Sequence, residues 1–134
     1  MQRIQFSKPS QHLGYIKMNY PEVFAEAAQA VQQPHLTDLN LIKPIYQTLW
    51  ETTENPSENK HFFLAVLIEC FYPTRRTCGV KLMPGLRDVI CEAMGYNNPE
   101  MVNYVGEPLE AHMKNPRFYN RVKETAAYFL AEYQ

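Results

Sequence analysis

Apolar residues recur at helical spacing along most of this chain, and that pattern predicts an all-α fold. Residues 62–72 (FFLAVLIECFY) are apolar on nearly every side, which is typical of a central helix packed all round. The apolar stripe of the last predicted helix, 116–133, consists of Phe118, Val122, Ala126, Phe129, Leu130 and Tyr133. We therefore predict a compact single-domain bundle of six or seven helices with a fully apolar central helix.

Prolines and asparagines divide the rest of the chain into further predicted elements. Proline suits the first turn of a helix, where its missing N–H would have had no partner. By this criterion helices begin at Pro21, near Pro44, at Asn55-Pro56, Pro84, Asn98-Pro99, Pro108 and Asn115-Pro116. A helix from 21 to 33 would be amphipathic, with Val23, Phe24, Ala27, Ala28 and Val31 on one face. One around 45 would bury Leu41, Ile45, Leu49 and Trp50. We expect residues 1–20 to form an irregular arm and residues 74–85 a basic loop.

The charge of the chain is nearly balanced overall but uneven along its length. The 134 residues carry a net charge of −1, so binding to nucleic acid would need a local cluster of cations. Residues 73–123 supply that bias, with eight Lys and Arg against five Asp and Glu. Glu69 lies in the most apolar segment, where we expect it to pair with an arginine or to reach the surface rather than to act as a catalytic acid.

The chemistry-bearing residues are scattered, which favours a protein without enzymatic activity. Cys70, Cys78 and Cys91 form no metal-ligand spacing and fit free thiols in a reducing compartment. The four histidines stand singly, and no phosphate-binding or nucleophile motif is present. We expect no metal, no cofactor, no membrane span and a cytoplasmic location, because neither a signal sequence nor a long apolar run occurs.

Residues 86–105 combine the features of a helix-turn-helix unit. Cys91 is a small residue inside the first helix and Gly95 follows four positions later, where a left-handed turn would end the helix. The apolar positions expected to hold the two helices together are Ile90, Met94, Tyr96, Met101 and Tyr104. The stretch EAMGYNNPE resembles the turn in the DNA-binding domains of AraC-type regulators. This resemblance implies a DNA-binding role, although it covers only about twenty residues.

The cations that such a role needs lie on a second Asn-Pro segment. Residues 98–107 and 115–124 share Asn, Pro, Asn, Val and Glu at matching positions, but only the later segment is basic. The repeat is either a duplicated functional unit or, as we favour, two helices that start alike. The candidate DNA-contacting residues are Arg75, Arg76, Arg87, Asn98, Asn103, Arg117, Arg121 and Lys123.

A protein partner or a homodimer is the alternative, because the last helix is crowded with aromatic residues. Tyr119, Tyr128 and Tyr133 are the candidate interface residues. The two hypotheses differ in what the surface around residues 98–105 should show. DNA binding requires the candidate cations to form one exposed face with that helix, whereas dominance by Glu100, Glu107 and Glu110 would weaken it.

Overall fold

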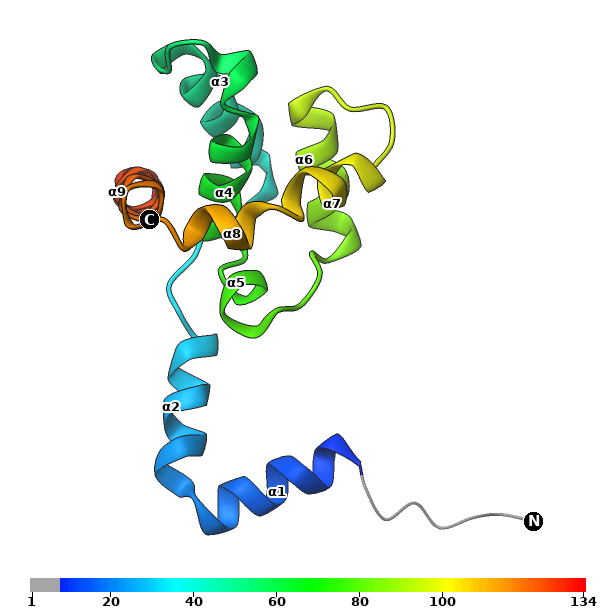
Figure 1. The fold of residues 1–134 in the computed structure, drawn as a ribbon, viewed down its shortest axis with the longest axis vertical. Coiled ribbons are helices and arrows are strands. Elements are labelled where there is room, and N and C mark those ends of the chain that lie inside the picture. The colour runs from blue at the N-terminus through cyan, green and yellow to red at the C-terminus, as the bar shows by residue number, and fades with distance from the viewer. Residues whose placement is uncertain (1–7) are drawn as a thin grey trace, which may run out of the picture. The chain divides into compact units, whose positions relative to one another are not determined.

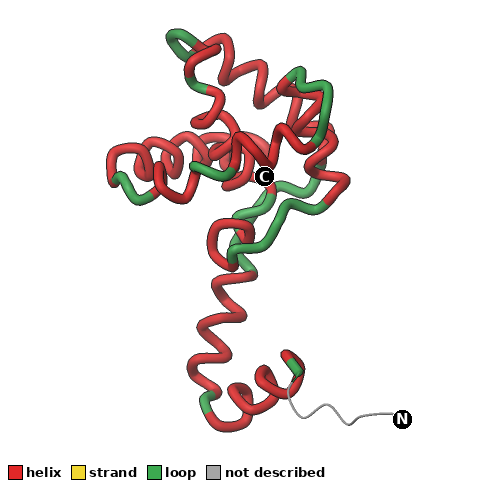
Figure 2. The backbone as a smooth tube through the Cα atoms, turned by 45° about the vertical axis from the view of Figure 1, so that its right-hand side comes forward, coloured by secondary structure: helices red, strands yellow, loops and turns green. Residues whose placement is uncertain are grey.

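The computed structural model describes residues 8–134, and these residues form helices joined by loops, with no strand among them (Figure 2). The predicted all-α class is confirmed. Nine α-helices lie in this range, and none of them is long and apolar enough to cross a membrane. The chain divides into two units, residues 1–33 and 34–134, which are described in turn.

The second unit contains the main hydrophobic core. Its helices are α3 (Ile42–Thr52), α4 (Lys60–Phe71), α5 (Thr74–Cys78), α6 (Pro84–Met94), α7 (Glu100–Gly106), α8 (Leu109–Met113) and α9 (Pro116–Tyr133), with 3-10 turns η1 (Leu39–Leu41) and η2 (Pro56–Glu58). Helices α3, α7 and α9 pack against α4 (Figure 1). Every residue from Phe62 to Phe71 is buried, so the prediction of a central helix enclosed on all sides is confirmed.

The central helix begins later than the sequence pattern predicts. Asn55 adopts a left-handed conformation with φ of 51°, and Pro56–Glu58 forms only a 3-10 turn. Helix α4 then starts at Lys60, after Asn59. The prediction that Asn55 and Pro56 open the central helix is therefore wrong. The left-handed conformation interrupts the helix before a separate turn, and among residues with a β-carbon it is tolerated best by Asn and Asp.

Helix α3 buries a slightly different face from the one predicted. Ile42, Ile45, Tyr46 and Leu49 are buried, whereas Trp50 is 38% exposed. The buried positions follow the i, i+3, i+4, i+7 spacing of a single helical stripe, and Trp50 lies at its edge. The ring of Trp50 still reaches the core, with its centroid 6.4 Å from that of Phe63.

The segment predicted as a basic loop contains a short helix. Thr74–Cys78 form α5, which follows Pro73 and ends at Gly79, where φ is 65°. Proline is preorganised for a first helical turn, and a left-handed glycine is a common helix stop. The loop prediction is therefore wrong for residues 74–78. This helix turns Arg75 and Arg76 toward the interior of the unit, as described below.

The first unit contains two helices, α1 (Pro9–Asn19) and α2 (Pro21–Val31). The expected irregular arm is wrong for residues 9–19, while residues 1–7 lie outside the described part of the chain. Pro9 occupies the first helical turn, and the Gln11 side chain accepts a hydrogen bond of 3.0 Å from the Lys8 backbone N–H. These two start signals outweigh Gly14, which costs a helix only about 1 kcal/mol relative to alanine.

Candidate functional site

The segment between α6 and α7 has the tight left-handed turn that the sequence pattern indicates. Gly95 has φ of 76°, and the N–H of Tyr96 donates to the Cys91 carbonyl at 3.0 Å, as in a Schellman helix end. The buried Cys91 thiol lies 3.3 Å from the carbonyl of Tyr96, so a larger side chain would not fit there without displacing the turn. Residues 95–99 connect the two helices, which is one residue longer than the usual helix-turn-helix connection.

Helix α7 packs through different side chains from those expected. Val102 and Gly106 are the buried residues of α7, whereas Met101 and Tyr104 are 41% and 68% exposed. The i, i+4 pair of Val102 and Gly106 faces the core because α7 packs on α4 as well as on α6. The prediction that Met101 and Tyr104 hold the two helices together is wrong, since both side chains point largely to solvent.

The first asparagine of each repeated segment accepts a hydrogen bond at the start of a helix: Asn115 is the N-cap of α9, and Asn98 directly precedes the N-cap of α7. The Asn98 side chain accepts a hydrogen bond from the Glu100 N–H, and Asn115 accepts one from the Arg117 N–H, each at 3.0 Å. This geometry supports the interpretation of the repeat as two helices that start alike. Asn103, the other amide proposed to contact bases, is half-buried within α7.

A buried ion cluster uses two of the candidate DNA-contacting cations. The Glu69 carboxylate is only 3% exposed and pairs with the Arg76 guanidinium, while Lys123 Nζ lies 3.4 Å from Glu69 Oε2. The hydrogen bond to Glu69 is the main reason that the pKa of Arg76 is raised. The expected pairing of Glu69 with an arginine is confirmed. Arg76 also lies over the ring of Tyr119, 5.6 Å from its centroid.

Two further cations are engaged with α7. The Arg75 guanidinium donates to the Gly106 carbonyl at 3.1 Å, where a positive charge complements the negative end of the helix dipole. Arg87 Nη1 lies 3.5 Å from Glu100, and its Nε lies 3.6 Å from the carboxylate of Asp88. The buried Nε of Arg87 has no hydrogen bond. Arg75 and Arg87 therefore join helices to one another.

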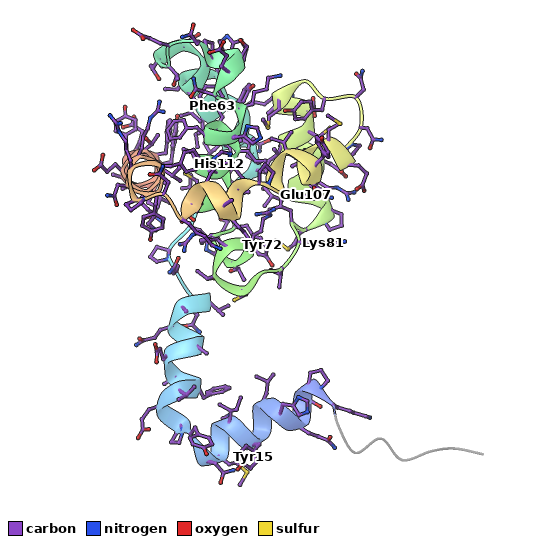
Figure 3. All side chains as sticks on the ribbon, in the orientation of Figure 1. Tyr15, Phe63, Tyr72, Lys81, Glu107 and His112 are labelled. Carbon is purple, nitrogen blue, oxygen red and sulfur yellow. The ribbon has the colours of Figure 1, made fainter. Side chains whose placement is uncertain are left out.

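The remaining candidates do not form a basic face with α7. Arg117 is exposed on α9, and the exposed Arg121 guanidinium stacks over Phe62, 4.0 Å from its centroid. Glu100, Glu107 and Glu110 are all exposed on α7 and α8 (Figure 3 labels Glu107). The surface that would approach a phosphate backbone thus carries three carboxylates, and most of the expected cations are held elsewhere.

The three tyrosines proposed as an interface lie along α9 with different exposure. Tyr119 is half-buried beneath Arg76, whereas Tyr128 and Tyr133 are 60% and 37% exposed. Tyr128 packs edge-on against the buried Phe129, with ring centroids 5.3 Å apart. Of the three tyrosines, only Tyr128 and Tyr133 in the C-terminal half of α9 therefore offer exposed aromatic surface to a partner.

The cysteines differ in their access to solvent. Cys70 is completely buried, and burial raises the pKa of its thiol to about 12. Cys91 is also buried, while Cys78 is exposed at the end of α5. Across residues 8–134 no three potential ligands cluster to hold a metal ion. The rings of His61 and His112 lie side by side, with their centroids 5.5 Å apart.

We expect a chromogenic disulfide reagent at about pH 8 to modify one thiol per folded chain rapidly, namely Cys78, because only exposed thiols react as thiolates. Cys70 and Cys91 should react only after denaturant is added. The Cys78→Ser variant should lose the fast phase, and any fast-reacting thiol in that variant would contradict the assigned burial of Cys70 and Cys91.

An apolar groove lies between α1 and α2, and the sequence pattern did not predict it. No residue of either helix is buried. The groove is lined by Leu13 and Ile16 from α1 and by Val23, Phe24, Ala27 and Val31 from α2. The sequence pattern predicted the apolar face that α2 contributes to this groove. It did not predict the face contributed by α1, because Pro9 and Gly14 suggested an irregular arm. A proline followed by Leu13 and Ile16 at helical spacing was the signal that could have shown it.

Comparison of the chain with protein-family models, with curated proteins and with solved structures found no match. The evidence for a function therefore comes from the surface of each unit.

Proposed function

We propose that this protein is a non-enzymatic interaction module that binds another protein chain through the helical pair α1–α2. The observation that carries the proposal is the apolar groove of that pair. Val23 is 53% exposed and Leu13 57% exposed, although both line the groove. The apolar stripe of an amphipathic helix is normally buried against another part of the protein or a partner. Full burial of each large apolar side chain stabilises the folded or bound state by about 1.5–3 kcal/mol.

The length of the two helices supports the same conclusion. Each has 11 residues, and isolated helices shorter than about 12–15 residues are marginal in water. With no buried residue of its own, the pair lacks the packing that usually stabilises short helices. A partner that covers the groove would supply it, as in helix-in-groove recognition.

Photo-crosslinking in cells that make the protein tests this proposal. A benzophenone amino acid replaces Ala27, which lies in the groove, in the full-length chain. The matched control carries the same amino acid at Ala25, an exposed position on the polar side of α2. We expect protein adducts from position 27 that are absent from position 25.

The proposal fails if position 27 gives no adduct beyond those of position 25. An adduct with a second copy of the chain and an adduct with a different protein both support it, because each is a protein chain seated on the groove. Mass spectrometry of the adduct then separates these two cases.

DNA binding through α6 and α7 is the second candidate, and the left-handed turn at Gly95 is the observation that favours it. Its support is weaker because Arg75, Arg76, Arg87 and Lys123 make contacts within the protein. Fluorescence anisotropy with random duplex DNA tests it. A protein with several phosphate contacts would bind at about 50 mM salt and lose roughly 10³-fold in affinity by about 200 mM. Absence of binding at low salt removes this candidate, while binding that weakens in Arg117→Ala and Arg121→Ala would support it.

A further inference from the structure

We infer that His61 and His112 form a binding site for a divalent transition-metal ion of the class that prefers imidazole ligands, such as Zn²⁺. The site lies in the second unit, so this inference goes beyond the proposed function and does not depend on it. His61 is the second residue of α4, and His112 lies in the last turn of α8 (Figure 3 labels His112). The metal ion would therefore join the central helix to a short surface helix.

The distance between the two rings fits a shared metal ion. Their centroids are 5.5 Å apart and their planes are inclined by 52°. A histidine nitrogen lies about 2.0–2.1 Å from Zn²⁺ and about 1.1 Å from the centre of its own ring, so two imidazoles on one tetrahedral ion have their centres about 5 Å apart. The ring torsion of histidine is broad, so each ring can turn a nitrogen toward the ion at little cost.

Both imidazoles are available to a metal ion. Within residues 8–134 neither ring takes part in a hydrogen bond or an ion pair. In the same range Arg87 Nε is the one buried side-chain nitrogen or oxygen without a hydrogen bond, so the ring nitrogens of the half-buried His61 reach solvent. His112 is exposed. An ion from solution can therefore reach both rings.

The packing around the pair holds the two helices in place. Phe62, which follows His61, is 4% exposed, and Leu109, one turn before His112, is 3% exposed. The His112 ring lies 5.3 Å from the Phe118 ring, which in turn meets Phe62 edge-on at 6.3 Å between centroids. The two backbones are therefore positioned before a metal ion binds, which lowers the entropy lost on binding.

Two imidazole ligands define the kind of ion that this site takes. Imidazole suits Zn²⁺, Cu²⁺ and Ni²⁺, whereas Mg²⁺ and Ca²⁺ prefer oxygen ligands. Among residues 8–134 no third His, Cys, Asp or Glu completes the site. Zn²⁺ usually has four ligands, so the remaining positions would be taken by water or by a side chain of another molecule. We therefore expect exchangeable binding rather than the tight binding of a structural zinc site.

Isothermal titration calorimetry of the tag-free full-length chain with Zn²⁺, at about pH 7.5 where histidine side chains are mostly neutral, measures this site. Every chain in the series carries Cys78→Ser, because the exposed thiol would bind Zn²⁺ by itself. We expect His61→Gln and His112→Gln each to weaken binding by about tenfold or more, because a second ligand on the same scaffold acts at high effective concentration. The matched control is His12→Gln, which removes an exposed histidine from α1 and should leave the affinity unchanged.

Urea unfolding in the presence of a chelator shows whether each variant is folded. Addition of Zn²⁺ should then raise the urea midpoint of the parent chain and of His12→Gln, but not that of His61→Gln or His112→Gln. A parent chain that binds no Zn²⁺ overturns the inference, and so does a folded His61→Gln or His112→Gln variant that binds as tightly as the parent. His112 is exposed, so His112→Gln still carries the test if His61→Gln does not fold.

Discussion

Replacement of Arg76 by Met is expected to lower the free energy of unfolding by about 3 kcal/mol. The reason is the Glu69 carboxylate, which is only 3% exposed and would keep a single cationic neighbour, Lys123 at 3.4 Å. Removing one partner of a buried ion pair leaves the other charge without adequate compensation. Methionine retains the apolar stem of the arginine, so the loss reports mainly on the charge. Urea unfolding followed by circular dichroism measures it.

The matched control is Arg117→Met, which removes an exposed arginine from α9 and should change stability by less than about 0.5 kcal/mol. Adding Glu69→Gln to Arg76→Met should recover part of the loss, because the buried charge is then absent. Equal stability of Arg76→Met and Arg117→Met would contradict the structural role of Arg76. If Arg76→Met also abolished DNA binding, that result alone would not identify a DNA contact.

Phe63→Ala is expected to lower the free energy of unfolding by about 4 kcal/mol, a typical loss when a buried aromatic side chain is truncated. Phe63, which Figure 3 labels, is fully buried on α4. Its ring packs edge-on against Tyr46, with centroids 5.7 Å apart. Truncation loses the burial of the ring and leaves a cavity that three neighbouring aromatic rings, Tyr46, Trp50 and Phe62, can fill only in part. The free energy comes from urea unfolding at constant temperature.

Phe118→Ala provides the comparison, because Phe118 is only half-buried against the same core. Its loss should be less than half that of Phe63→Ala. The loss expected for Phe63→Ala is a substantial share of the 5–15 kcal/mol by which typical domains are stable against unfolding. A loss below about 2 kcal/mol for Phe63→Ala would show that α4 is not the centre of the core.

The helical fold could be predicted because apolar spacing reports directly on burial. The run from Phe62 to Phe71 has no polar face to expose, so its central position followed from sequence alone. Val122, Ala126 and Phe129 of α9 are likewise buried at the spacing expected. Local signals were less reliable at helix starts, as the left-handed Asn55 and the helical residues after Pro9 show. There the conformation of one residue decides between a turn and a helix.

The candidate site was harder to predict, because its charges are paired across long stretches of sequence. Lys123 meets Glu69 from a helix 54 residues further along the chain, and nothing local in the sequence indicates that contact. The sequence does not distinguish a cation that is paired within the protein from one that is free to bind phosphate. The groove between α1 and α2 was not predicted for a related reason, since it exists only when both helices form.

The hydrogen bond from Arg75 to the Gly106 carbonyl has an evolutionary consequence. A β-carbon at position 106 would lie 2.8 Å from Arg75 Nη2, so any side chain there would displace the guanidinium. The two positions should therefore covary among descendants of this sequence. Lineages that retain arginine at 75 should keep glycine at 106, and lineages that lose the arginine should be free to acquire alanine, which favours the helix by about 1 kcal/mol.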